Sequence, residues 1–408
     1  MKDAQPDYDL LIVGGGMVGG CLALALQGSG LRIALLEAVA PTQRFKSSAG
    51  KRAIALSWGS RCLLQQLGLW DKLQADAIPI PKIHVSDQGH FGKARLDAEQ
   101  QGVASLGYVV AASAIERVIY DALEDSDCEL LCPATLNDFE TDEGQVSVHL
   151  TIEKNTETRT TRLLVGADGA DSRVRSEGGF DVEHYDYQQT AITTMLATES
   201  DDHSTAFERF TPRGPLAMLP HFDGLYSLVW TQSSDTAEHT QALSDSDFIA
   251  QLQHEFGDWL GALSLAGPRQ TFPLRLSRVK QTISHRCVLI GNAAHQLHPV
   301  AGQGFNLGLR DAAQLAEVVL NHQEDPGQAD CLSHYQALRG PDQSLISGFT
   351  DGVVRLFSND LWPFNLARNS GLLLLDKWPL LKRAFAQQTM GVARRRPRLS
   401  PRNQQHDG

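Results

Sequence analysis

The clearest hydrophobic pattern of the chain lies in its first forty residues. Asp9–Val13 (DLLIV) is a continuous apolar run typical of a buried strand, and three glycines end it. Met17–Gln27 is rich in Ala and Leu and favours a helix, which Gly28 or Gly30 can cap. Arg32–Leu36 (RIALL) is a second apolar run and leads into Glu37. The pattern predicts one βαβ unit with two parallel strands.

The rest of the chain alternates between helical and extended patterns. Between residues 185 and 275, short β-type runs are split by Pro, Gly and Asp, which predicts an antiparallel sheet. From Pro341 to Val392 bulky apolar residues recur every three or four positions, which predicts helices. The other predicted elements are helices at Ser60–Leu73, Ser113–Leu123 and Gly304–Asn321, a hairpin at Ile83–Leu96, and strands within Cys128–Leu164 and at Arg286–Ile290.

Composition narrows the class of protein. The net charge of −12 over 408 residues argues against nucleic acid as the main partner, because phosphate binding needs a basic surface. The six cysteines are scattered and are expected to be reduced thiols. No apolar run approaches the roughly 20 residues that a membrane-spanning helix needs, and the acidic N-terminus has no signal-peptide pattern. We therefore expect a cytoplasmic protein.

A glycine-rich turn follows the first predicted strand. Gly14, Gly16 and Gly19 match G-x-G-x-x-G, open a predicted helix, and are followed by an acidic residue, Glu37, after the second strand. Gly14 permits the tight turn, Gly16 lets the backbone approach a pyrophosphate, and Gly19 lets helix and strand pack closely. Glu37 is placed to accept hydrogen bonds from the adenosine ribose. The motif predicts a dinucleotide site, and by itself it suits NAD as well as FAD.

Three later segments decide between these cofactors. They are Val165–Ser172 (VGADGADS), Gly291–His295 (GNAAH) and His298–Asn306 (HPVAGQGFN). The segments resemble, in order, signatures of the FAD-dependent aromatic hydroxylases of the para-hydroxybenzoate hydroxylase type. The resemblance covers residues 8–390. Within that family, residues 50–56, 207–220 and 291–309 look most like the ubiquinone-biosynthesis hydroxylases that act on 2-polyprenyl-6-methoxyphenol.

The resemblance implies which residues meet the cofactor. The flavin ring would lie against Pro299, Gly302, Gln303 and Gly304, at the positive end of the following helix. The residues implied to contact FAD are Gly14, Gly16, Gly19, Glu37, Arg52, Arg117, Asp168, Gly169, Gly291, Asn292, Gly304, Phe305 and Asn306. The alternative for Arg52 and Arg117 is a surface or interdomain salt bridge. For Asp168 the alternative is a turn cap, and a turn cap is compatible with a place in the cofactor cleft. Asn292 stands where the family usually has Asp, and we interpret it as a subfamily mark.

No metal site and no protein nucleophile are expected. His295 and His298 are three residues apart, but no acidic cluster accompanies them. No Ser/His/Asp or Cys/His arrangement stands out, and the catalytic side chains stay unknown, since a flavin carries the chemistry itself.

The reaction implied by the resemblance consumes NAD(P)H and O₂. A flavin C4a-hydroperoxide would transfer oxygen to a polyprenylated phenol, para to its hydroxyl. Three alternatives stay open: another ring position in the same pathway, reduction of a polyprenyl chain, and a non-catalytic FAD-binding subunit of the biosynthetic complex. A basic C-terminal tail could contact a membrane surface or a partner subunit, and oligomerisation is open.

These patterns together predict an α/β protein with a Rossmann-like FAD-binding domain that is discontinuous in sequence. We assign residues 1–79, 106–184 and 276–335 to this domain. Residues 80–105 and 185–275 would form an inserted, mainly antiparallel substrate-binding sheet. Residues 336–392 would form a C-terminal helical region, and 393–408 a disordered basic tail.

Overall fold

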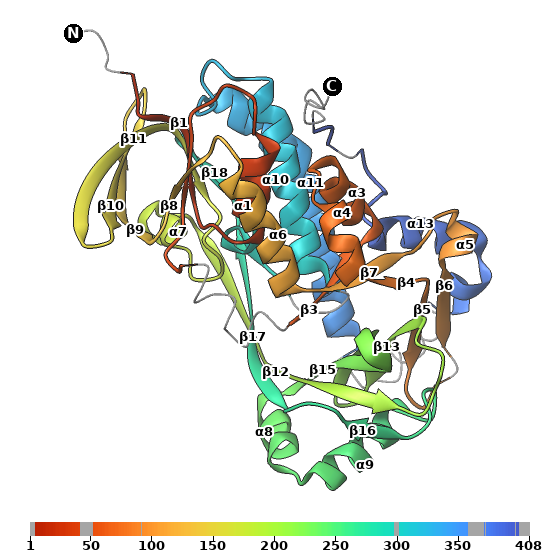
Figure 1. Ribbon diagram of the computed structural model, residues 1–408. Coiled ribbons are helices and arrows are strands. Elements are labelled where there is room, and N and C mark those ends of the chain that lie inside the picture. Colours follow the sequence, from red (N-terminus) through yellow and green to blue (C-terminus); the bar gives the residue numbers. More distant parts are fainter. Residues whose placement is uncertain are drawn as a thin grey trace.

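The computed structural model describes residues 5–40, 52–90, 92–297, 302–357, 371, 373–395 and 397–399. Its strands form an eight-stranded, a nine-stranded and a three-stranded sheet. Helices pack against the first of these sheets in the upper half of Figure 1, and the second sheet occupies the lower half. This arrangement confirms the predicted mixed α/β class, with an antiparallel sheet and C-terminal helices.

The eight-stranded sheet is built around the predicted βαβ unit. Its main path runs β18-β19-β11-β1-β2-β8, and β1 pairs in parallel with both β11 and β2. Leu10 and Ile12 of β1 face a core shared with the helices, whereas Leu11 and Val13 face a second core on the other side. The strands are β1 (Tyr8–Val13), β2 (Ile33–Leu36), β8 (Glu129–Leu131), β9 (Ala134–Thr141), β10 (Val146–Ile152), β11 (Asn155–Gly166), β18 (Ile283–Ser284) and β19 (Cys287–Leu289).

Helices α1 (Met17–Ala25), α6 (Ala112–Glu124) and α10 (Gln303–Leu320) cover one face of this sheet. Close packing of α1 depends on small residues, because a Cβ at Gly20 would lie 2.4 Å from Ile119 Cγ2 of α6. The short helices α3 (Trp58–Gln66), α4 (Trp70–Leu73) and α7 (Arg173–Glu177) lie at the edges of the same part. The predicted helices over 113–123 and 304–321 are therefore present, whereas the helix predicted over 60–73 is two helices, α3 and α4, with a break at 67–69.

The nine-stranded sheet combines the hairpin near residue 90 with the middle of the chain. Its main path runs β20-β17-β12-β15-β14-β13-β5-β6, and β16 pairs with β12. All pairings are antiparallel except that of β13 with β5. The strands are β5 (Lys82–Asp87), β6 (Lys93–Asp97), β12 (Val182–Thr198), β13 (Thr205–Thr211), β14 (Gly214–Pro220), β15 (Leu225–Ser233), β16 (Leu263–Leu265), β17 (Gln270–Val279) and β20 (His295–Gln296).

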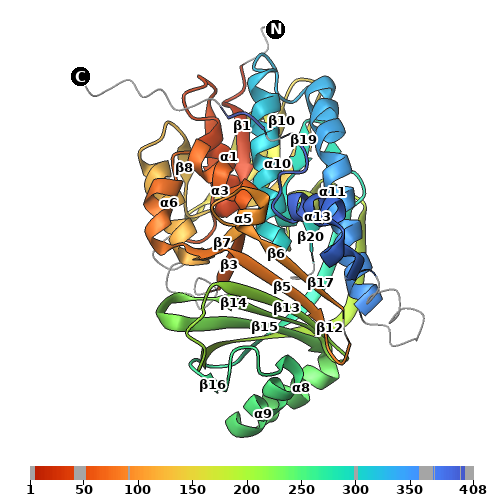
Figure 2. The same ribbon diagram turned by 90° about the vertical axis from the view of Figure 1, so that its right-hand side faces the viewer.

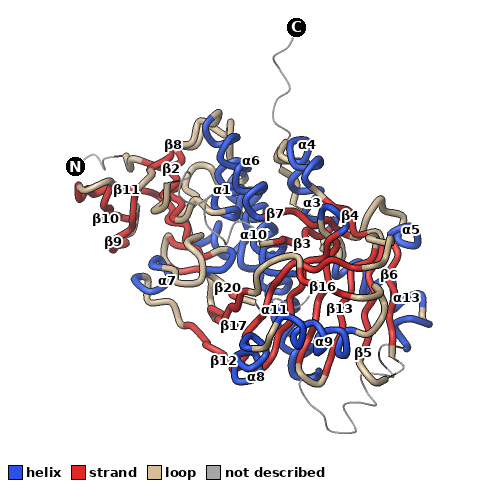
Figure 3. The backbone as a smooth tube through the Cα atoms, turned by 60° about the horizontal axis from the view of Figure 1, so that its bottom comes forward, coloured by secondary structure: helices blue, strands red, loops and turns tan. Residues whose placement is uncertain are grey.

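Two helices that the hydrophobic pattern did not predict cover the outer face of this sheet. They are α8 (Ser234–Ala242) and α9 (Asp245–Phe256), which Figure 3 shows lying across the strands. Phe248, Leu252 and Phe256 of α9 pack on Trp230 and Met218, so these last two side chains belong to the core. Ser233 and Ser244 accept hydrogen bonds from the first-turn amides of α8 and α9, and such caps are a local helix signal.

A three-stranded sheet, β3-β7-β4, lies between the two larger ones (Figure 2). Its strands are β3 (Ala53–Ser57), β7 (Gly107–Ala111) and β4 (Ile78–Ile80). Ile80 and Val109 pack with Ala206 of β13 in a small apolar cluster that joins the two parts. The helix α5 (Ala98–Gln101) connects the β5–β6 hairpin back to β7.

The C-terminal region differs from the prediction in two ways. Helix α11 (Ala329–Phe357) begins well before Pro341 and continues through it, whereas the sequence pattern placed the start at this proline. The tail, expected to be disordered, packs where it is described: Leu399 is 6% exposed within the main core, and its amide donates to Gln66 Oε1 at 3.1 Å. Helix α13 (Pro379–Thr389) precedes the tail. None of the described helices is long and apolar enough to cross a membrane.

Candidate cofactor site

The β1–α1 turn has the geometry that its glycines predict. Gly14 has φ +107°, and a Cβ there would lie 2.5 Å from the carbonyl oxygen of Ala167. A Cβ at Gly19 would lie 2.0 Å from the carbonyl oxygen of Gly14. Gly16 is the N-cap of α1 and offers no side chain, and the first turn contains no acidic residue. The amide groups of this helix end are therefore left for an anionic ligand.

The second motif lies directly against this turn. Ala167 donates its amide to Val13, and Gly169 has φ +85°. Asp168 accepts hydrogen bonds from Ser172 Oγ at 2.5 Å and from the Arg173 amide at 2.7 Å, so its carboxylate caps α7. The described contacts thus show Asp168 as a turn cap. Gly169 is the part of the motif whose backbone can approach a ligand.

The third motif completes the same edge of the sheet. Ile290 donates to Gly166, and Gly291 follows with φ +59° beside Val18, where a Cβ would come within 3.2 Å. Asn292 is exposed and makes no hydrogen bond to any residue that the structure describes. Three distant stretches therefore meet around the N-terminus of α1, which is where parallel sheets bind ligands.

The N-terminus of α10 contains two glycines with different surroundings. Gly302 is the N-cap, with φ +58°, and a Cβ on it would lie 2.9 Å from Ala55 Cβ of β3. At Gly304 an added Cβ would meet no described atom within 4 Å. A flat ring could therefore approach the backbone at Gly304, with the amides of the first turn of α10 beside it. Phe305 is partly buried against the main core.

Asn306 holds this turn in place. Its side-chain oxygen accepts the Ser57 amide at 2.8 Å, and its Nδ2 donates to the carbonyls of Ala55 at 2.8 Å and Gly302 at 2.7 Å. The Asn306 side chain is thus committed to the backbone of β3 and of the N-cap. These three bonds fix the first turn of α10 against β3.

The charged residues predicted for the site differ in burial and in hydrogen bonding. Glu37 is 6% exposed, accepts the Val39 amide at 2.9 Å, and lies over Gly15, where a Cβ would be 3.1 Å from its Oε2. Arg52 is exposed at the start of β3. Arg117 is exposed on α6 and makes no hydrogen bond or ion pair within the described part of the chain. Pro299 lies outside the described residues.

A buried ionic cluster beside the site was not predicted. Asp311 of α10 is fully buried and accepts the Gly291 amide at 3.2 Å, His295 Nε2 at 2.6 Å and Gln343 Nε2 at 3.0 Å. Arg339 of α11 donates its Nε at 2.9 Å to Oδ1, the oxygen that also accepts from Gln343, whereas Gly291 and His295 bond Oδ2. Burial alone would raise the pKa of Asp311, but the charges and hydrogen bonds of these partners hold it below its usual range. The cluster fixes the Gly291 turn to α10 and α11.

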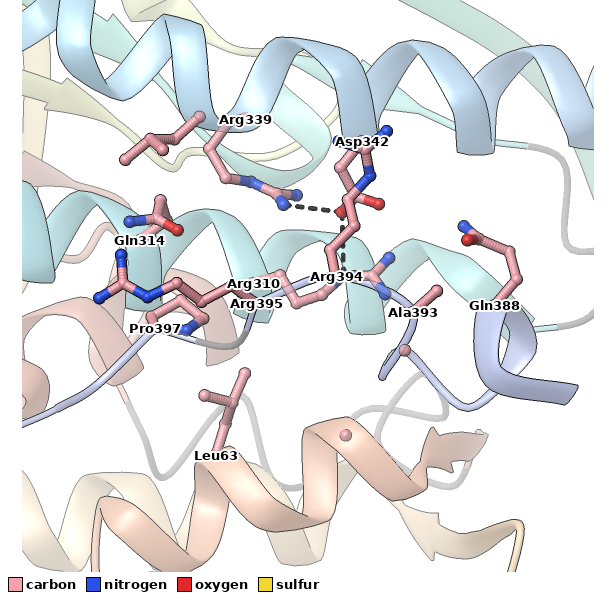
Figure 4. Close-up of a pocket in the computed structure, with 13 residues that line it drawn as sticks. Leu63, Arg310, Gln314, Arg339, Asp342, Gln388, Ala393, Arg394, Arg395 and Pro397 are labelled. Carbon is pink, nitrogen blue, oxygen red and sulfur yellow. Dashed lines mark hydrogen bonds and ion pairs between the residues drawn. The ribbon is translucent and has the colours of Figure 1, made fainter. Parts of the chain in front are cut away.

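The same ion pairs border a hollow between α3, α10, α11 and the C-terminal tail (Figure 4). The Asp342 carboxylate forms ion pairs with Arg339 Nη1 at 2.7 Å and with Arg310 Nε at 3.3 Å, which the dashed lines mark. Arg394 and Arg395 of the tail cross its opening. None of the residues predicted to contact the cofactor lines this hollow, so it is separate from the turn at Gly302.

The donor set fits FAD. The N-termini of α1 and α10 have no acidic residue in their first turns. The crowded glycines at 14 and 19 suit a pyrophosphate at one end, and the open backbone at Gly304 suits a flat ring at the other. Among the described residues, no group of three His, Cys, Asp or Glu side chains is arranged to hold a metal ion.

Comparison with known proteins agrees with this geometry. Residues 7–345 match the family model described as FAD binding domain. The chain is 39% identical to ubiquinone hydroxylase UbiL of Rhodospirillum rubrum, over 95% of this chain and 91% of the relative. It is 32% identical to 3-demethoxyubiquinol 3-hydroxylase of Escherichia coli, over 94% and 98% of the two chains. Among solved structures, p-nitrophenol 4-monooxygenase PnpA of Pseudomonas putida superposes with a TM-score of 0.78 at 19% identity, covering 95% and 99% of the two chains, which shows a shared fold.

The matched region includes all the glycine turns described above, and the relatives of 30% identity or more span nearly the whole chain. The resemblance read from the sequence motifs is therefore confirmed, and the chain belongs to the FAD-binding-domain family of flavin-dependent aromatic monooxygenases.

Proposed function

We propose that this protein hydroxylates a polyprenylated phenol in ubiquinone biosynthesis, consuming NAD(P)H and O₂. The relatives named as ubiquinone hydroxylases support the pathway. The observation that carries the proposal is the open space beside the Gly304 backbone, because amides at a helix N-terminus can face the reactive ring of a flavin there.

FAD would be held at both ends of this site. The α1 amides beyond Gly16 would face the pyrophosphate, and Glu37 would accept hydrogen bonds from the adenosine ribose. The further contacts that we propose are Gly14, Gly19, Arg52, Arg117, Gly169, Gly291, Asn292, Gly304 and Phe305, with Asp168 and Asn306 acting through the turns that they hold. Bound there, FAD would supply the activation of O₂, from which one oxygen atom enters the substrate ring.

The α10 terminus has a defined part in this chemistry. Its first-turn amides and the positive end of the helix, beginning at Gln303, would favour negative charge on a reduced flavin. Asn306 keeps the turn rigid by bonding β3 and Gly302 together. Because the site is held by backbone contacts, we propose that substrate recognition falls to the nine-stranded sheet, which faces it across β3 (Figure 2).

We propose 2-polyprenyl-6-methoxyphenol as the substrate, hydroxylated para to its hydroxyl to give the 1,4-benzoquinol. Residues 50–56, 207–220 and 291–309 support this choice through their resemblance to hydroxylases of that substrate. The relative named for 3-demethoxyubiquinol supports a different ring position as the second candidate.

Quinone-intermediate profiling by mass spectrometry in a deletion strain distinguishes the two. Accumulation of 2-polyprenyl-6-methoxyphenol is the expected result, and accumulation of a later demethoxy intermediate would replace the first candidate with the second. In vitro, the purified protein should couple NAD(P)H oxidation to O₂ uptake when a phenol is present. Bound flavin that NAD(P)H does not reduce, with or without phenols, would favour a non-catalytic subunit instead.

A further inference from the structure

The two faces of the nine-stranded sheet have different neighbours, and β13 shows this residue by residue. Phe207 and its cross-strand partner Met218 lie in the core beneath α9. Ala206 packs on the opposite face, against Ile80 and Val109. Because side chains alternate along a strand, Glu208 shares the face of Ala206. Its carboxyl group therefore faces the FAD-binding part of the molecule rather than the outer helices.

Glu208 is surrounded by apolar side chains. Its cross-strand neighbours are Ala217 of β14 and Val85 of β5, and its carboxyl group makes no hydrogen bond or ion pair with any described residue. The adjacent Arg209 cannot serve as a counter-ion on this face, because its guanidinium donates to the Glu255 carbonyl and Ser86 Oγ on the other. Burial raises the pKa of the Glu208 carboxyl to about 7, although the side chain keeps some access to solvent.

Other titratable groups on this face are few in the described part of the chain. Asp87 of β5 lies opposite Phe210, and its carboxylate is 3.3 Å from His90 Nδ1. The elements packed against the face from the FAD-binding part contribute Ala53, Ile80 and Val109. Asp87 thus already has its own partner, and no cation in the described part of the chain pairs with Glu208.

The same cluster links Glu208 to the ring end of the site. Ala53 of β3 packs in the cluster with Ala206, and Ala55, two residues further along β3, lies against Gly302. Figure 2 shows β3 and β7 between α10 and the strands β13–β15. A substrate ring held on this face of the sheet would lie between Glu208 and the N-terminus of α10.

An unpaired carboxylate among apolar groups is costly unless a ligand supplies a polar partner. A phenol ring with one hydroxyl is an apolar ligand with a single acidic hydrogen-bond donor. We propose that Glu208 is the general base that takes the proton from the phenol hydroxyl of the substrate, an inference that rests on the proposed function. The O–H bond breaks, its electron pair stays on the phenol oxygen, and Glu208 returns the proton to that oxygen after the ring has been hydroxylated.

The chemistry of the two groups favours this pairing. A phenol ionises near pH 10, and an ordinary glutamate near 4.3, so an unperturbed carboxylate is a weak base towards it. A carboxylate whose pKa is near neutral is a stronger base and is better matched to the pKa of the phenol. Removing the proton makes the ring more electron-rich, and an electron-rich ring accepts an electrophilic oxygen more readily.

The test compares Glu208→Gln with Glu238→Gln, which changes an exposed carboxylate on α8 of the same part of the chain. For Glu208→Gln we expect kcat to fall about 100-fold or more, with FAD content and KM near wild type. The rise of kcat with pH around 7 should disappear in this variant and persist in Glu238→Gln. Glu208→Asp should keep that rise at a lower kcat. A ring-fluorinated phenol, whose hydroxyl is more acidic, should recover part of the Glu208→Gln loss.

A second readout needs neither cofactor nor turnover. Infrared titration of the apoprotein should show a carboxylic-acid carbonyl band that disappears as the pH rises through about 7, and Glu208→Gln should lack it. Wild-type kcat and pH profile in Glu208→Gln, or absence of that band from the wild type, would overturn the role of Glu208 and leave the proposed function standing. A wild-type protein that hydroxylates no phenol would overturn the proposed function, and this inference with it.

Discussion

His295 Nε2 and the Asp311 carboxylate meet at 2.6 Å in the interior, where neither side chain is more than 3% exposed. The same carboxylate receives the Gly291 amide, Arg339 and Gln343. The Gly291 turn, which follows the last strand of the FAD-binding sheet, is thereby tied to α10 and α11 through the buried Asp311 carboxylate.

Asp311→Asn should lower the free energy of unfolding by about 3 kcal/mol, because it leaves the buried Arg339 cation without its main counter-charge. Urea unfolding at pH 7 measures this loss. Asp201→Asn, at an exposed position, is the control and should stay within about 0.5 kcal/mol of wild type. An Asp311→Asn protein as stable as the control would show that the cluster is not needed for stability.

Gly304→Ala should separate cofactor binding from stability. The added Cβ meets no atom of the described residues within 4 Å, and Ala favours a helix over Gly, so the apoprotein should gain about 0.5–1 kcal/mol. If the flavin ring lies against Gly304, FAD should bind at least about tenfold more weakly, a loss of about 1.4 kcal/mol. Titration of apoprotein with FAD measures the affinity. Gly348→Ala, on α11 with equally open surroundings, should show the stability gain alone.

Arg117→Ala tests the cofactor role of an arginine that pairs with no described residue. We expect FAD affinity to fall about tenfold, as for loss of one charged hydrogen-bonding partner, with the apoprotein's stability unchanged. Lys72→Ala removes a cation from an exposed position on α4 and should leave FAD affinity as it is. Equal affinities for both variants would assign Arg117 to the surface.

Asn292→Asp should still purify with stoichiometric FAD. Asn292 is exposed and unpaired among the described residues, so a carboxylate there buries no uncompensated charge. The ratio of flavin to protein absorbance measures occupancy. A colourless apoprotein would show that the asparagine is required rather than a subfamily mark.

The raised pKa of Glu208 also predicts how stability depends on pH. The folded state holds the proton up to about pH 7, whereas the unfolded chain releases it near 4.5, so the stability of the wild type falls as pH rises between these values. Glu208→Gln removes this cost. At pH 8 it should be more stable than wild type by about 2 kcal/mol, and the difference should vanish below pH 4.5. A constant difference across that range would contradict the burial of the charge.

The elements around the cofactor were predictable because their signals are local. The run at Asp9–Val13, the glycines after it and Glu37 specify strand, turn and strand within thirty residues. The motifs at 165–172 and 291–306 needed comparison with a family, since nothing in their spacing says that they meet the first turn. Their contact at Gly14 and Ala167 is set by sheet order, which hydrophobic periodicity does not encode.

Other features could not be predicted from the sequence, for physical reasons. Helices α8 and α9 are short and polar on their outer sides, so periodicity alone missed them although Ser233 and Ser244 cap them. Pro341 was interpreted as a helix start, but tertiary packing carries α11 through it. The partners of Asp311 lie up to 32 residues away on another helix. A single buried carboxylate does not change the hydrophobic periodicity, so the sequence pattern does not reveal it.

The order of strands in the eight-stranded sheet has a consequence for folding. β19 pairs with β11 at Val165 and Val288, and the whole nine-stranded sheet apart from its β5–β6 hairpin and β20 is encoded between them. During synthesis the N-terminal strands are complete long before their neighbour emerges, so this edge of β11 must wait unpaired while the inserted sheet forms. Closure then joins segments far apart in sequence, a slow step by loop entropy. Cofactor binding, for which we propose contacts at both Gly14 and Gly291, should therefore follow this closure and report it rather than the folding of the first unit.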